Sequence, residues 1–172
     1  NNLDTIGEQS GFLHDLGKYR TNFQNYLKNV SGIDNTAIYD INNKTHASAG
    51  MFLTRDTVSD PVISSIIQYV IGCHHSGLLD ITGTKSIESR FSDPKYQLEY
   101  SDTMANAPTE VAGKKFEHTR PNIVGKTNTH QILSLSLATR IVFSAMVDSD
   151  WSDTANWMGK TSKHKANYSS IP

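Results

Sequence analysis

Four histidines of this 172-residue chain lie where predicted helices begin or end, and acidic residues accompany them. They are His14, His46, His74 and His75, and His14 is followed directly by Asp15. Neutral imidazole and carboxylate groups are the preferred ligands of borderline divalent metals such as Mn, Fe, Co, Ni and Zn. The residue types and their spacing therefore predict a metal site.

A further acidic pair, Asp148 and Asp150, ends the last apolar segment. Four imidazoles with carboxylates near both ends of the chain exceed what one tetrahedral ion needs, so we expect two divalent ions. Two neighbouring cations can activate water and neutralise both the attacking and the leaving oxygen of a phosphodiester. The other histidines, His118, His130 and His164, lie in polar segments or at a helix start, and we do not expect them to take part.

Helices must position these groups, because apolar residues recur at spacings of three and four and period-two alternation is scarce. The pattern predicts an all-α fold with helices over about 3–17, 23–30, 45–54 and 61–71, and from about 129 into the acidic pair. Thr45 is the expected N-cap of the third helix, and Pro61 suits the first turn of the fourth. The fourth helix is apolar on most sides and should be central.

Residues 81–128 break this pattern, because apolar residues are sparse there and proline and glycine recur. Connections of this length without regular structure are commonly lids, partner-binding insertions or disordered segments. We therefore predict a long polar insertion, 81–128, within a single domain that spans residues 1–172.

Composition excludes several classes of protein. The net charge of −1 argues against a protein that coats nucleic acid nonspecifically. No run approaches the roughly 18 apolar residues that cross a bilayer, so no membrane partner is expected. Cys73 is the only cysteine, which excludes a disulfide scaffold and fits a reducing, cytoplasmic location.

The ordered set of His-Asp, His, His-His and Asp resembles the signature of the HD superfamily of metal-dependent phosphohydrolases. Four segments are similar to the HD nuclease domain of the CRISPR-associated helicase-nuclease of type I interference systems: GFLHDLGKYRTNFQNYL, THASAG, VIGCHHSGLLD and FSAMVDSDWSDT. The resemblance covers about residues 5–80 and 130–155. It implies an HD-domain helical bundle interrupted by the polar insertion.

The resemblance also implies two divalent ions, with Mn, Fe, Co or Ni expected and Mg or Zn as alternatives. Their implied ligands are His14, Asp15, His46, His74, His75 and Asp148. Asp15 would bridge the two ions, and Lys18 would contact the scissile phosphate. Asp150 is expected to support the site or end the helix instead of binding metal directly.

The family has a further histidine upstream of the His-Asp pair, whereas none of the 13 residues before His14 is a histidine. Either this chain is a piece of a longer protein and begins after the helix that carries that histidine, as we expect, or its first metal site is incomplete. The first metal, which lacks that histidine, should bind more weakly than the second.

The substrate implied by the resemblance is single-stranded DNA, cut internally and then degraded. A helicase region in the same polypeptide or in a partner would feed the strand, and a crRNA-guided surveillance complex would recruit the enzyme. No Walker-type phosphate loop occurs in these residues, so we expect the nuclease module alone. Candidates for stacking on bases are Tyr19, Tyr26, Trp151 and Trp157.

Two other functions stay open from the sequence. An HD phosphohydrolase acting on small nucleotides would use the same ligands, but in a closed, base-specific pocket. A noncatalytic module would bind metal or a CRISPR protein through the insertion, and replacing His14 or Asp15 would then leave DNA cleavage by the intact protein unchanged.

Overall fold

A computed structural model describes residues 2–157, and within them the regular structure is helical, with no strand. The helices are α1 (Asp4–Leu13), the 3-10 helix η1 (Leu16–Tyr19), α2 (Thr21–Val30), α3 (Ser48–Thr57), α4 (Pro61–Cys73), α5 (Ile87–Ser92), α6 (Pro94–Asn106), α7 (Thr109–Ala112) and α8 (Asn128–Trp157). The all-α prediction is confirmed. His164, which we did not expect to take part, lies outside the described residues.

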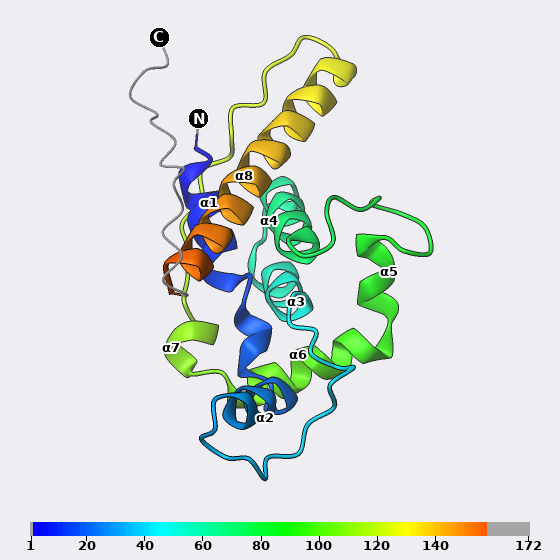
Figure 1. Cartoon of the computed structure of the whole chain (residues 1–172). Helices are drawn as coiled ribbons and strands as arrows, with labels where there is room; N and C mark the ends of the chain where they lie inside the picture. The colour runs from blue at the N-terminus through cyan, green and yellow to red at the C-terminus, as the bar shows by residue number, and fades with distance from the viewer. Residues whose placement is uncertain (1, 158–172) are drawn as a thin grey trace.

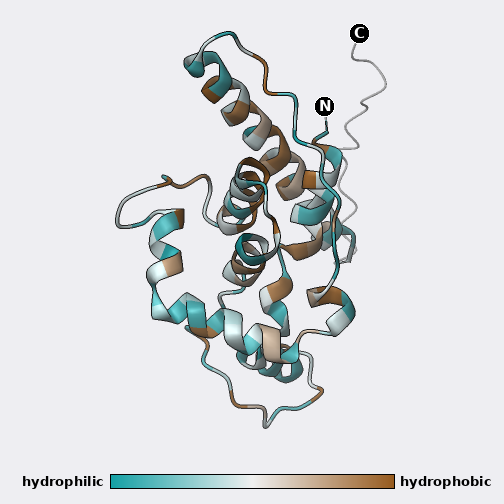
Figure 2. Ribbon diagram, turned by 180° about the vertical axis from the view of Figure 1, so that it is seen from behind, coloured by the Kyte–Doolittle hydropathy of each residue, from teal (hydrophilic) through white to brown (hydrophobic). Residues whose placement is uncertain are grey.

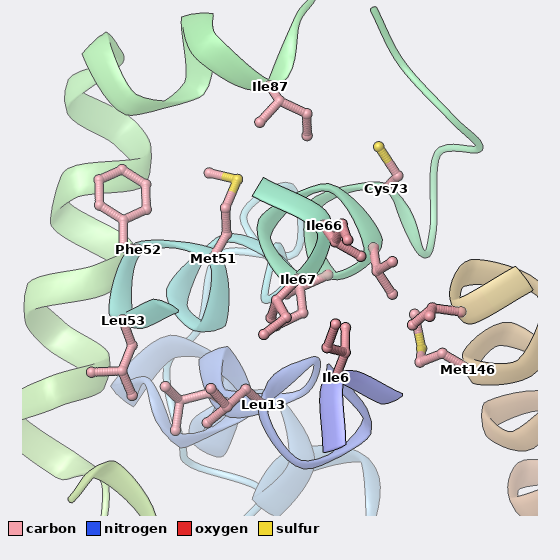
Figure 3. Packing of buried hydrophobic residues seen from close by; sticks show 14 of the residues in the cluster. Ile6, Leu13, Met51, Phe52, Leu53, Ile66, Ile67, Cys73, Ile87 and Met146 are labelled. Carbon is pink, nitrogen blue, oxygen red and sulfur yellow. The ribbon is translucent and has the colours of Figure 1, made fainter. Parts of the chain in front are cut away.

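Helix α4 lies at the centre of the bundle, with α3 and α1 against it and α8 across α1 and α4 (Figure 1). Ile66, Ile67 and Val70 of α4 are almost completely buried, as its apolar sequence predicts. Figure 3 shows side chains from α1, α3, α5 and α8 converging on this helix. The same helix ends at Cys73, immediately before the His74-His75 pair.

The start of α4 follows from its capping residues. The Asp60 side chain accepts hydrogen bonds from the backbone N–H groups of Val62 and Ile63. Pro61 occupies the first turn, where its missing N–H has no helical partner to lose. The predicted role of Pro61 is confirmed.

The predicted first helix is shorter than expected and divides in two. α1 ends at Leu13, Asp15 leaves the helical conformation with φ −99° and ψ 8°, and η1 then begins at Leu16. A continuous helix would carry residues 14–17 along a straight axis. The break instead turns the chain at the His-Asp pair, so that η1 contacts both α2 and α3.

The third predicted helix also begins later than expected. α3 starts at Ser48, its N-cap is Ala47, and no side chain of the cap residue satisfies the first backbone N–H groups. The prediction of Thr45 as N-cap is wrong, because Arg20 engages the Thr45 carbonyl and hydroxyl, at 3.0 and 3.3 Å. The segment that carries His46 therefore has no regular secondary structure and is held by long-range contacts.

Residues 81–128, the predicted polar insertion whose structure the sequence left open, contain α5, α6 and α7. α6 packs along α3, where the ring of Tyr100 stacks on that of Phe52 at 5.3 Å. Tyr96, Tyr100 and Met104 recur every four residues on the face that meets the core. Polar atoms on the tyrosines hid this helical period, and α6 also buries the charged side chain of Glu99.

Helix α8 has 30 residues, and its first turns project beyond the other helices of the bundle (Figure 1). Its first half exposes Ile132, Leu133 and Leu137. The part of α8 that projects from the bundle carries brown, hydrophobic segments in Figure 2. By length and composition alone, α8 is long and apolar enough to cross a membrane. The sequence analysis had found no apolar run of that length. That criterion is weak for a single helix, because core helices of soluble proteins also meet it.

Candidate metal centre

Within residues 2–157, potential metal ligands gather in two groups, in each of which the ligand atoms all lie within 4.8 Å of one another. The first group is Asp15, His46, His74 and His75. The second group is His14, Asp15 and Asp150. Residues from the ends of α1 and α4, the segment before α3 and the second half of α8 thus meet at one place, with Asp15 common to both groups.

The two oxygens of Asp15 face different histidines. Oδ1 lies 3.4 Å from Nε2 of His46, and Oδ2 lies 3.3 Å from Nε2 of His14. Ligands about 2.1 Å from a common ion lie about 3.4 Å apart in tetrahedral and about 3.0 Å apart in octahedral coordination. Each carboxylate oxygen therefore lies at the spacing of two ligands that share a divalent ion.

Three histidines are oriented by backbone carbonyls that accept from Nδ1. The pairs are His14 with Gly11 (2.7 Å), His46 with Lys44 (3.2 Å) and His74 with Ile71 (2.6 Å). A hydrogen bond at one ring nitrogen sets the tautomer and leaves the other nitrogen free to bind metal. Nε2 of His14 and of His74 is buried with no hydrogen-bond partner among the described residues, as expected of metal ligands.

His75 completes the first group from the turn after α4. Its Nε2 lies 2.8 Å from Nε2 of His46, and its ring centroid lies 3.9 Å from that of His74. Adjacent histidines reach one centre because the chain bends sharply here, and Gly77 adopts φ +73°, a conformation that glycine alone adopts freely.

The carboxylates of the site favour positive charge between them. Burial alone would raise the pKa of Asp15, but the neighbouring His14 and Lys18 hold it well below its usual range. Burial likewise opposes protonation of His14, yet Asp15, the Gly11 carbonyl and Asp150 together raise its pKa. The field that favours a proton at His14 also favours a divalent cation.

His74 and His46 are held neutral. Burial lowers the pKa of His74 to about 4, and the neighbouring His75, His14 and His46 add to that effect. Burial also lowers the pKa of His46, although Asp15 and the Lys44 carbonyl oppose the shift. Neutral imidazoles at neutral pH are the form that binds metal.

Two glycines allow the ligand-bearing segments to approach each other. A Cβ atom on Gly17 of η1 would lie 2.2 Å from the carbonyl oxygen of His46. A Cβ atom on Gly50 of α3 would lie 2.1 Å from the carbonyl oxygen of Leu13. Any larger residue would push the His-Asp pair and His46 apart.

The acidic residue of α8 that reaches the site is Asp150. Its Oδ1 lies 3.5 Å from Nε2 of His14, whereas Asp148 is exposed and belongs to neither group. Two residues along an α-helix rotate a side chain by about 200°, so only one of the two can face α1. The structure thus places Asp150 where the sequence analysis expected Asp148.

Lys18 lies beside the metal-ligand groups, in contact with Asp15. Its Nζ donates to Oδ2 of Asp15 at 2.5 Å, and its side chain is 40% exposed. An ammonium group with this exposure can remain near Asp15 or turn toward a ligand in solvent.

A cleft of about 380 Å³ lies beside the second group, between α1 and α8. Its lining residues include Gly7, Gly11, Met146 and Asp153. The residues that line it include no Phe, Tyr or Trp. The cleft thus offers acidic, small and aliphatic side chains together with the imidazole of His14.

A helical bundle with a His-Asp pair at the end of one helix, and further histidines converging on it, defines the class of HD domains. A family model described as Cas3, HD domain matches residues 9–152, and the chain belongs to this family. Membership implies a metal-dependent HD nuclease of CRISPR systems. Comparisons with curated proteins and with solved structures found no match.

Proposed function

We propose that this chain cleaves single-stranded DNA at a centre of two divalent ions bridged by Asp15. The observation that carries the proposal is the position of the two Asp15 oxygens, 3.4 Å from His46 and 3.3 Å from His14. A single carboxylate with one oxygen in each ligand group supports a pair of neighbouring ions better than one isolated ion.

The proposed ligands divide as the geometry suggests. One ion would be held by Asp15, His46, His74 and His75. The other would be held by His14, Asp15 and Asp150. Mn²⁺, Fe²⁺, Co²⁺ or Ni²⁺ suit this nitrogen-rich set, and Mg²⁺ or Zn²⁺ are alternatives. Bound divalent ions supply Lewis-acid activation of water and neutralise charge on the phosphodiester.

Because the cleft is lined by acidic side chains, a phosphodiester can bind there only when cations are bound as well. Asp15, Asp150 and Asp153 lie along it, and their carboxylates repel a phosphate group. Lys18 supplies a positive charge beside the cleft through its contact with Asp15. We propose that this ammonium group turns toward the scissile phosphate and offsets the negative charge that develops there.

Substrate selection is proposed from the surroundings of the cleft. Trp151 follows Asp150 on α8 and is 74% exposed, so its ring is available for stacking on an unpaired base. Trp157 is also exposed, whereas Tyr19 packs against the core and Tyr26 packs against Phe23. The exposed tryptophans favour a flexible single strand over a stiff duplex.

The cellular setting is also part of the proposal, and membership of the family supports it. A helicase region, in the same polypeptide or in a partner, would deliver the strand, and a crRNA-guided surveillance complex would recruit the enzyme. The reaction would take place in the cytoplasm. A single domain over residues 1–172 would then act as the nuclease module of a larger assembly.

The decisive experiment follows cleavage of an end-labelled single-stranded oligonucleotide by the chelator-treated chain after addition of Mn²⁺. We expect cleavage with Mn²⁺ and little cleavage of the matching duplex. Asp15→Asn should lower the cleavage rate by about 100-fold or more, because replacing groups that only support metal ligands already lowers activity by about 10–100-fold. Asp34→Asn, an exposed acid outside both ligand groups, is the matched control and should cleave normally.

Free nucleotides serve as the competing substrate in the same assay. Hydrolysis of deoxynucleoside triphosphates without cleavage of the oligonucleotide would replace the proposal by a small-nucleotide phosphohydrolase. Unchanged DNA cleavage by Asp15→Asn would remove the enzymatic role from this site altogether.

A further inference from the structure

A buried ionic cluster lies behind the metal-site residue His46, on the side of the segment that faces α6. Its members are Arg20 at the end of η1, Thr45, and Glu99 of α6. Arg20 is 6% exposed and Glu99 is 1% exposed. Charged side chains are seldom buried to this degree unless they have a specific partner or task.

Each member of the cluster holds the backbone around His46. Nη1 of Arg20 donates to the carbonyl oxygen of Thr45 at 3.0 Å and to the Asn43 side chain at 3.3 Å. Oε1 of Glu99 accepts from the backbone N–H of Ser48 at 3.2 Å. The chain is therefore fixed on both sides of His46, one residue before it and two residues after it.

Glu99 performs the task that a local N-cap performs in other helices. The N-cap residue of α3, Ala47, has no side chain able to accept from the first-turn N–H groups. A carboxylate at a helix N-terminus is favoured by the helix dipole as well as by its hydrogen bonds. Here that carboxylate comes from 51 residues away, so the start of α3 depends on α6.

Stability alone is a weak explanation for this pair. Nη1 of Arg20 and Oε2 of Glu99 lie 3.9 Å apart, and Nε of Arg20 and Oε2 of Glu99 have no hydrogen-bond partner among the described residues. A buried pair with incomplete hydrogen bonding recovers little of the cost of removing its charges from water, and an apolar pair of similar size is often no less stable. Burial accordingly raises the pKa of Glu99.

We infer that Arg20 and Glu99 are positioning residues for the metal centre, and that α6 takes part in the site through them. They hold residues 45–48 so that Nε2 of His46 faces Oδ1 of Asp15. The inference rests on the proposed function only in taking His46 as a metal ligand. It assigns to the segment 81–128 a role in building the site, where the sequence suggested a lid or an insertion.

The test measures binding of Co²⁺ to the chelator-treated 172-residue chain by calorimetry and by the visible absorption of the bound ion. The double variant Arg20→Met with Glu99→Leu removes both charges together and so leaves none unpaired. We expect it to fold and to bind Co²⁺ about 10-fold more weakly with an altered spectrum, the scale typical of groups that support metal ligands. The single variant Glu99→Gln keeps an acceptor for the backbone N–H of Ser48. We expect it to bind Co²⁺ nearly as tightly as the unaltered chain does.

Tyr100→Phe is the matched control on the same helix. It removes the hydrogen bond of 3.0 Å from Tyr100 to Asp56, near the other end of α3, and leaves residues 45–48 untouched. We expect Co²⁺ affinity to be unchanged. An equal loss in Tyr100→Phe and in the double variant would overturn the inference, because any weakening of α6 docking would then suffice.

If the double variant does not fold, a second variant tests the positioning role. Thr45→Val keeps the shape of the side chain and removes only the hydroxyl that accepts from Arg20. We expect weaker Co²⁺ binding and faster amide exchange at Ser48. Unchanged affinity in Thr45→Val, or in a folded double variant, would show the inference wrong.

His46→Ala separates the two hypotheses. If His46→Ala weakens Co²⁺ binding and the cluster variants do not, the positioning role fails and the proposed metal site stands. If His46→Ala itself has no effect, the proposed site fails, and the positioning role fails with it.

Discussion

His14 and Asp150 face each other across the packing of α1 against α8, with Nε2 3.5 Å from Oδ1. Asp148, two residues earlier on α8, is exposed. We therefore expect Asp150→Asn to slow Mn²⁺-dependent cleavage by about 10-fold or more, and Asp148→Asn to leave it nearly unchanged. Cleavage rates of the two variants at saturating Mn²⁺ test this. A larger loss in Asp148→Asn would return the ligand role to the residue that the sequence analysis favoured.

The two ligand groups differ in size, and this predicts unequal metal binding. The group around His46 has four potential ligands and the group around His14 has three. Each additional ligand lowers the dissociation constant, so we expect titration with Mn²⁺ to show a tighter and a weaker binding event. His75→Ala should weaken the tighter event, and Asp150→Ala the weaker one. Two equal sites with full occupancy would contradict the prediction.

Gly17 should tolerate no side chain. Its Cβ would lie 2.2 Å from the carbonyl oxygen of His46, so Gly17→Ala should lower the free energy of unfolding by about 1–3 kcal/mol and weaken metal binding. Urea unfolding and Mn²⁺ titration measure the two effects.

Gly7→Ala is the control for Gly17→Ala, because a Cβ on Gly7 within α1 would meet no atom within 4 Å. Alanine loses less conformational entropy than glycine in a helix, so this variant should gain about 0.5–1 kcal/mol in unfolding free energy. Equal losses in both variants would mean that the close approach of η1 to His46 is not the cause.

Lys18 offers a way to separate metal binding from catalysis. Its Nζ contacts Asp15 at 2.5 Å, yet it would bind no metal itself. Lys18→Gln should reduce the maximal cleavage rate while the Mn²⁺ dissociation constant stays the same or falls, because a competing positive charge is removed. A variant with normal cleavage but weaker Mn²⁺ binding would assign Lys18 a supporting role and remove its proposed contact with phosphate.

Alkaline pH should weaken the contact between α6 and α3. Burial and the hydrogen bond to Asp56 raise the pKa of Tyr100 to about 12, against an ordinary value of 10.0. Between these values the folded chain holds a proton that the unfolded chain has lost, so stability falls as pH rises. Urea unfolding at pH 9 and pH 11 should show a smaller decrease for Tyr100→Phe. Equal decreases would show that Tyr100 does not contribute.

Much of the site could be predicted from the sequence because the ligands are adjacent or follow helix ends. The pairs at 14–15 and 74–75 are recognisable by residue type, and the capped start of α4 was predictable from Asp60 and Pro61. The spacing of apolar residues was enough for an all-α fold. α6 escaped prediction because its core-facing residues include tyrosines, whose polar atoms weaken the periodic signal.

Residue types and their order along the chain therefore determined the class of chemistry, since imidazole and carboxylate are metal-binding groups whatever fold carries them. Tertiary structure alone decided which groups meet. The rotation of α8 selects Asp150 over Asp148, and the packing of α6 on α3 brings Glu99 to the N-terminus of α3 from 51 residues away. Local sequence carries no record of either choice, because both depend on how helices dock and not on how each one forms.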